Sequence, residues 1–255
     1  MIKIENLVKL YNNKKALDGL NLEIKAGEIF GLIGHNGAGK STTIKSIVSI
    51  IKPTSGKIYI NGLDLEEKRD EIKKMIGYVS DTPDMFLRLS AISFWKFIAD
   101  VYGVDSKIRE ERLEHLMDIF SMKENQYKTL EEFSHGMRQK TFIIAALLSD
   151  PKIWILDEPL TGLDPQSAYN LKQLMREHAN SGNTVLFSTH VLETAEALCD
   201  RIGILSRGKL IFSGTIDDLK SIHSGENLEK IYLNMISENN SEDNNIINTK
   251  QQGQV

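Results

Sequence analysis

The chain has 255 residues, of which 41% are hydrophobic and 26% are charged, and its net charge is −4 at pH 7. This composition is typical of a globular protein and excludes a disordered chain, which would be poorer in apolar residues. The acidic balance argues against a dedicated nucleic-acid binder, so we expect no nucleic-acid partner. The longest apolar run, 142–148, is too short to span a bilayer. The single cysteine and the charged N-terminal segment favour a reducing, cytoplasmic compartment without a secretory signal.

Apolar segments alternate with amphipathic segments through most of the chain. In chain order, apolar runs predict strands at 28–33, 57–60, 153–156, 184–188, 202–205 and 209–212. Apolar residues at helical spacing predict helices at 41–51, 91–102, 107–120 and 136–148. This alternation predicts an α/β fold in which a mostly parallel sheet carries helices on both faces. The strand-free block from about 86 to 150 predicts a helical subdomain inserted into that fold.

The composition changes near the end of the chain. Eight of the 19 residues from Ser237 to Val255 are Asn or Gln, and few are apolar. Such a segment cannot bury a core, so we expect a disordered tail over 237–255. The predicted organisation is therefore a main domain over 1–220, a C-terminal extension over 221–236 and this tail.

The strongest chemical signal is a glycine-rich segment between the strand predicted at 28–33 and the helix that follows. It fits the pattern G-x-x-x-x-G-K-[ST] of a phosphate-binding loop. Its glycines let backbone N–H groups point at phosphate oxygens, and the helix presents its positive dipole end to them. Lys40 would reach the β- and γ-phosphates, and the Ser41 hydroxyl would bind Mg²⁺. The predicted nucleotide-binding residues here are Gly34, His35, Asn36, Gly37, Ala38, Gly39, Lys40, Ser41 and Thr42.

A second signal is the pair of carboxylates that follows the apolar strand predicted at 153–156. Asp157 can hold Mg²⁺, through water, and Glu158 can polarise an attacking water as general base. An apolar run that ends in Asp-Glu is common by itself and is often only a turn cap. Its occurrence together with a phosphate-binding loop favours the functional interpretation.

Five segments, in this order along the chain, resemble those of the ATP-binding subunit of an ABC transporter, over roughly residues 1–220. They are 34–41 (Walker A), 133–137 (signature), 153–158 (Walker B), 161–164 (D-loop) and 188–190 (switch histidine). The resemblance implies a P-loop NTPase-type sheet, an antiparallel β subdomain, and ATP as the nucleotide. It also implies two partners, a second ATPase subunit and a separate multi-span permease. The protein would then lie peripherally at the cytoplasmic face of the cell membrane.

The resemblance further implies roles for single residues, and each has an ordinary structural alternative. Tyr11 would stack on adenine, or it is an edge tyrosine in a turn. Asp164 would lie at a dimer interface, or it caps the helix that begins at Pro165. Ser134 and Gly136 would meet the γ-phosphate held by the opposing subunit, or they begin a Ser-capped helix. The implied catalytic residues are Lys40, Glu158 and His190.

The signature segment departs from the family pattern Leu-Ser-Gly-Gly-Gln. Phe133, His135 and Met137 replace three of the five residues, whereas Ser134 and Gly136 remain. We therefore expect a working but divergent contact with phosphate, to which a protonated His135 would add positive charge.

A second departure lies in the segment that resembles the Q-loop, where Asp81 stands in place of glutamine. A carboxylate suits Mg²⁺ but repels phosphate. The alternative is an aspartate in an ordinary turn before Pro83. Asp81 joins Ser41 and Asp157 as a predicted metal-binding residue.

The leading hypothesis is a Mg-dependent ATPase that powers a permease exporting a drug, peptide or similar compound. Phe94, Trp95 and Phe97 would form the surface that contacts the permease, or they belong to an amphipathic helix that packs into the core of its own subunit. One alternative is a soluble ABC ATPase, which the single domain and the absence of heptads oppose. Another is a regulatory module that closes on ATP and hardly hydrolyses it, which Asp81 and the altered signature favour but the intact Lys40 opposes.

Overall fold

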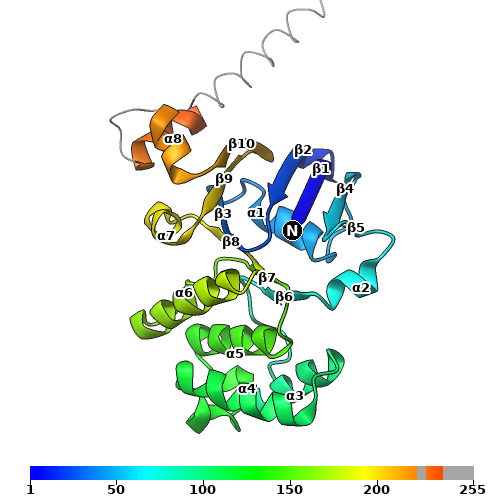
Figure 1. The fold of residues 1–255 in the computed structure, drawn as a ribbon, viewed down its shortest axis with the longest axis vertical. Coiled ribbons are helices and arrows are strands. Elements are labelled where there is room, and N and C mark those ends of the chain that lie inside the picture. Colours follow the sequence, from blue (N-terminus) through cyan, green and yellow to red (C-terminus); the bar gives the residue numbers. More distant parts are fainter. Residues whose placement is uncertain (223–227, 238–255) are drawn as a thin grey trace, which may run out of the picture.

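A six-stranded sheet in the order β10-β9-β3-β8-β7-β6 forms the centre of the fold. The computed structural model describes residues 1–222 and 228–237 (Figure 1). The strands are β3 (Ile29–Ile33), β6 (Ile76–Val79), β7 (Ile153–Leu156), β8 (Thr184–Thr189), β9 (Arg201–Ser206) and β10 (Lys209–Gly214). All neighbouring pairs are parallel except β9 with β10. The mostly parallel sheet predicted from the sequence is confirmed.

A second sheet, in the order β2-β1-β4-β5, is antiparallel throughout. Its strands are β1 (Ile2–Tyr11), β2 (Lys14–Ile24), β4 (Ser55–Ile60) and β5 (Leu63–Asp64). One face of β1 is buried through Ile2, Ile4 and Leu7, and the intervening residues carry charge or polarity. The antiparallel β subdomain implied by the resemblance is therefore present.

The two faces of the central sheet pack against different layers, because side chains alternate along each strand. Phe30, Leu32 and Ile155 pack toward α1 (Lys40–Ile47) and the antiparallel sheet. Trp154 and Leu156, whose side chains lie on the opposite face, pack toward α6 (Pro165–Asn180) and the helical subdomain. Both faces of the sheet are covered, as the continuous apolar strands predicted.

The helical subdomain lies at the lower end of the molecule in Figure 1, in green. It comprises α3 (Ala91–Val101), α4 (Ser106–Ile119), η1 (Lys123–Asn125), η2 (Leu130–Glu132) and α5 (His135–Leu148). Trp95 is fully buried in it and donates its indole N–H to the carbonyl of Thr141 at 2.9 Å. Two further short helices are α2 (Arg69–Lys73) and α7 (Leu192–Leu198).

The C-terminal part packs against the central sheet where β10, β9 and β3 lie. It consists of α8 (Ile216–Ile222) and a further helix over 228–237. Ile231 is fully buried in a cluster with Ile33 and Ile204. The tail expected over 237–255 lies outside the described residues except for Ser237. None of the helices in the described parts of the chain is long and apolar enough to cross a membrane.

Candidate nucleotide-binding site

The glycine-rich loop connects the carboxyl end of β3 to the first residue of α1. Gly37 and Gly39 have positive φ values of 82° and 114°, which L side chains rarely adopt. Lys40 is 6% exposed, and its ammonium group donates to the carbonyl of Gly34 at 2.6 Å. Ala38, within the loop, is fully buried. The loop therefore has the strand–loop–helix context that a phosphate-binding loop requires.

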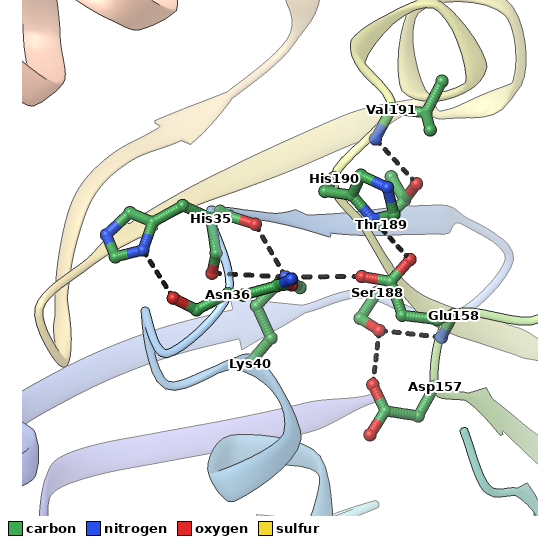
Figure 2. A network of polar contacts seen from close by, with 10 residues as sticks. His35, Asn36, Lys40, Asp157, Glu158, Ser188, Thr189, His190 and Val191 are labelled. Atoms are coloured by element: carbon green, nitrogen blue, oxygen red, sulfur yellow. Dashed lines mark hydrogen bonds and ion pairs between the residues drawn. The ribbon is translucent and has the colours of Figure 1, made fainter. Parts of the chain in front are cut away.

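The carboxylate of Glu158 lies between two cationic or titratable groups (Figure 2). Its Oε1 atom is 3.3 Å from the ammonium of Lys40, and its Oε2 atom is 3.0 Å from Nδ1 of His190. The side chain of Glu158 is 19% exposed, whereas that of His190 is 55% exposed. Three residues from three separate segments, predicted to be catalytic, are thus brought together.

Ser188 fixes the positions of both acidic residues after β7. Its hydroxyl donates to Oδ1 of Asp157 at 2.5 Å and accepts the backbone N–H of Glu158 at 2.9 Å (Figure 2). Glu158 has a left-handed backbone with φ of 49°, which is uncommon for a residue other than glycine. The neighbouring strand β8 therefore fixes the backbone of Glu158, and with it the position from which the carboxylate extends.

Asp157 has the properties of a metal-binding carboxylate. It is fully buried, and its Oδ2 atom has no hydrogen-bond partner among the described residues. Burial raises the pKa of Asp157, and the hydrogen bond from Ser188 opposes that change. Mg²⁺ commonly takes one or two carboxylates and completes its coordination with phosphates and water. The unpartnered oxygen fits such an ion.

A cavity of about 760 Å³ opens beside the loop, and most of the predicted nucleotide-binding residues line it. Tyr11, which is 45% exposed, lies at its rim, and Asp81 also lines it. The carboxylate of Asp81 lies 3.9 Å from the ammonium of Lys45. The other predicted residues that line this cavity are His35, Asn36, Gly37, Gly39, Lys40, Ser41, Thr42 and Glu158.

Ser134 and Gly136 lie away from this cavity, at the start of α5. Ser134 caps the helix by accepting the backbone N–H of Met137 at 3.3 Å. Asp164 likewise caps α6 and pairs with Lys140 at 2.7 Å, a contact that holds the pKa of its carboxyl far below the ordinary range. The capping alternatives are therefore correct, and they do not conflict with contact to a partner's nucleotide.

Gly136 is required by close packing, and we expect a substitution there to be costly. A Cβ atom at this position would lie 2.3 Å from the carbonyl oxygen of Gly162, so the backbone would have to move. We expect Gly136→Ala to lower the free energy of unfolding by about 1–3 kcal/mol, measured by urea denaturation. The exposed neighbour provides the control, because His135→Ala removes atoms and should change stability by much less. Equal stability of Gly136→Ala and the wild type would contradict the packing argument.

Two features of the site were not predicted from the sequence. The bridging role of Ser188 depends on β8 lying next to β7, which only the strand order reveals. Lys14, Lys15 and Arg207 also line the cavity, although none of them belongs to a recognised motif. In the sequence, the only indication of these three residues was that each is a basic residue in or beside a turn.

The fold and the loop define a P-loop nucleotide-binding domain with an inserted helical subdomain, and comparison with known proteins specifies its family. The ABC transporter family model matches residues 17–161. The chain belongs to the ABC transporter family, as an ATP-binding subunit.

Three relatives illustrate this membership. A linearmycin resistance ATP-binding protein of Bacillus subtilis is 34% identical over 93% of this chain and 76% of its own length. A bacitracin transport ATP-binding protein of Bacillus licheniformis is 36% identical over 86% of this chain and 71% of its own length. The chain spans only 61% of an ABC transporter ATP-binding protein of Nostoc sp., at 36% identity over 80% of this chain.

Solved structures agree with this assignment. The structure of an ATP-binding subunit of an ABC transporter superposes with a TM-score of 0.88 at 34% identity, covering 92% of this chain and 99% of the other. A dimeric ATP-binding cassette in a post-hydrolysis state, bound to ADP and Pi, gives a TM-score of 0.76 at 25% identity. That comparison covers 85% of this chain and 99% of the other.

Proposed function

We propose that this chain is the Mg-dependent ATPase subunit of an exporter, and that Glu158 activates the attacking water. The observation that carries the proposal is the position of Glu158 between Lys40 and His190. A carboxylate in that place can accept a proton from water, while the two neighbours orient it and contact phosphate. Lys40 would leave the carbonyl of Gly34 for the β- and γ-phosphates when ATP binds.

The other predicted residues have matching proposed roles. The backbone N–H groups of loop 34–42 would hold the phosphates, and Tyr11 would stack on adenine. Ser41, Asp157 and Asp81 would hold Mg²⁺, which supplies neutralisation of the charge on the β- and γ-phosphates. Ser134 and Gly136 would contact the γ-phosphate bound by the partner subunit.

Removal of divalent cations tests the metal part of the proposal. We expect EDTA to abolish ATP hydrolysis and added Mg²⁺ to restore it, because one buried oxygen of Asp157 has no hydrogen-bond partner in the described parts of the chain. Phosphate release from ATP is the measurement. Asp81→Asn should raise the Mg²⁺ concentration needed for half-maximal rate several-fold, since a neutral oxygen replaces a carboxylate. A rate unchanged by EDTA would contradict the metal requirement.

A second ATPase subunit and a separate permease are the proposed partners, with the chain held peripherally at the cytoplasmic face of the cell membrane. The dimeric cassette with which the chain superposes supports the pairing of two ATPase subunits. The two relatives named for linearmycin resistance and bacitracin transport support export of a drug, peptide or similar compound.

The surface that would receive the permease can be narrowed to exposed residues of the helical subdomain. Phe94 and Trp95 are buried, so the core interpretation is correct for both. Phe97 is 44% exposed, and it lies beside the exposed Phe86 with ring centroids 5.5 Å apart. Met85 is exposed next to Phe86. These three side chains form an apolar surface suited to an amphipathic helix.

An affinity purification from detergent-solubilised membranes tests the transporter assignment. We expect tagged chain to retain a multi-span membrane protein in stoichiometric amount. Phe97→Glu should reduce that recovery several-fold without changing the ATPase rate of the isolated chain, whereas Tyr169→Glu, at an exposed aromatic on α6, serves as control. Recovery of ribosomal proteins, or of the chain alone after crosslinking, would contradict the proposal.

A further inference from the structure

The nucleotide cavity contains a cationic residue that no motif explains. Arg207 lines it together with His35 and Lys40. Arg207 and Gly208 form the two-residue turn between β9 and β10. This turn is far in sequence from the phosphate-binding loop and lies outside all five segments that resemble family motifs.

Hydrogen bonds fix the turn against the phosphate-binding loop. The backbone N–H of Gly208 donates to the carbonyl of Ala38 at 2.8 Å, and the N–H of Asp18 donates to the carbonyl of Gly208 at 2.9 Å. A Cβ atom at Gly208 would lie 2.6 Å from the carbonyl oxygen of Ala16, so only glycine fits there. Arg207 therefore keeps a fixed position relative to the loop.

Arg207 occupies a backbone conformation that its side chain does not favour. The φ values of Arg207 and Gly208 are 49° and 80°, which is the type I′ arrangement of a two-residue hairpin. Two other hairpins in the described chain have this arrangement, and both begin with asparagine, at Asn12 and Asn61. Asparagine tolerates the left-handed region, whereas a longer side chain there costs about 1–2 kcal/mol. An unfavourable residue at a cavity wall is typical of a functional position.

The charge of the cavity wall fits a polyphosphate. Among the described residues, four cationic side chains line the cavity against only the carboxylates of Asp81 and Glu158, although the whole chain is acidic. We propose that the guanidinium of Arg207 contacts the polyphosphate of the bound nucleotide and raises its affinity. This inference rests on the proposed ATP-binding function.

Arg207→Asn tests this inference with little risk to the fold, because asparagine suits the turn. The measurement is isothermal titration of the isolated chain with Mg-ADP and with adenosine. We expect Arg207→Asn to bind Mg-ADP about tenfold more weakly than the wild type, because one hydrogen bond to a charged group is lost. Its affinity for adenosine, which carries no phosphate, should equal that of the wild type. The melting temperature should be equal or higher. Lys209→Gln, on the same hairpin but outside the cavity wall, controls for net charge.

Three results would overturn the inference, and one of them also bears on the proposed function. Equal Mg-ADP affinities of Arg207→Asn and the wild type would exclude a phosphate contact. An equal loss for Mg-ADP and adenosine would place the effect at the base or in the fold. A wild-type chain that does not bind Mg-ADP would contradict the proposed ATP-binding function itself, and the inference with it. If the wild type binds Mg-ADP and Lys40→Met does not, the function stands, and the comparison of Arg207→Asn with the wild type tests the inference alone.

Discussion

Glu158→Gln is expected to reduce the ATP hydrolysis rate by about 10²–10⁴-fold, because glutamine keeps the shape of the side chain but cannot accept a proton from water. The hydrogen bond from the backbone N–H of Glu158 to Ser188 does not involve the side chain, so the left-handed turn should persist. ATP binding should therefore remain. The measurement is phosphate release in a single turnover, together with ATP affinity.

The control for this prediction is Glu193→Gln, which removes an exposed carboxylate from the first turn of α7. It makes the same change in charge outside the cavity wall, and its hydrolysis rate should match that of the wild type. A Glu158→Gln variant with a normal rate would exclude this residue as general base. Little or no phosphate release from the wild type, unchanged in Glu158→Gln, would instead favour a module that closes on ATP and hardly hydrolyses it.

Lys40→Met is expected to weaken ATP binding by at least about 30-fold, because removal of one partner from a buried charged contact costs about 2–5 kcal/mol. Lys40 is almost fully buried, and its stem can be replaced by methionine without opening a large cavity. The ammonium also contacts Glu158 at 3.3 Å, so hydrolysis should be lost together with binding. Titration with Mg-ADP measures the loss of affinity without interference from hydrolysis, because Lys40 would also contact the β-phosphate.

A matched control is Lys52→Met, whose ammonium pairs with Glu66 on the surface and is 81% exposed. An exposed ion pair contributes little, so neither binding nor stability should change noticeably. The melting temperature of Lys40→Met without nucleotide must also be measured, because the carbonyl of Gly34 loses its donor. Unchanged Mg-ADP affinity of a folded Lys40→Met chain would contradict the location of the phosphate site.

The four inner strands of the central sheet, β9, β3, β8 and β7, were predictable because burial on both faces leaves a continuous apolar run, whereas the edge strand β6 was not assigned. The strand predicted at 153–156 coincides with β7 for this reason. The strands β1 and β2 were not assigned from the residues themselves, because only one face of each is buried and the other carries charged residues. The helix predicted at 41–51 ends earlier, at Ile47, because Ser49 has a left-handed φ of 57°. The apolar residues Ile50 and Ile51 continued the helical spacing beyond the true end.

The candidate site was predictable only in part, for a similar physical reason. Local spacing identifies the loop and the acidic pair, since each depends on residues close in sequence. The contact of Lys40 with Glu158 depends on β3 and β7 flanking β8, and strand order is not encoded in any local pattern. Arg207 was not predicted to line the cavity, because a turn residue becomes part of the site only through the packing of β9 and β10 beside β3.

The separation of Ser134 and Gly136 from the cavity of their own chain has a kinetic consequence. If these residues complete the partner's site, one copy can hold ATP but cannot turn it over. The specific activity of the isolated chain would then rise with protein concentration and reach a plateau only when pairing is complete. Unassembled copies in a cell would keep their nucleotide intact, so ATP would be consumed only where two subunits are gathered at a permease.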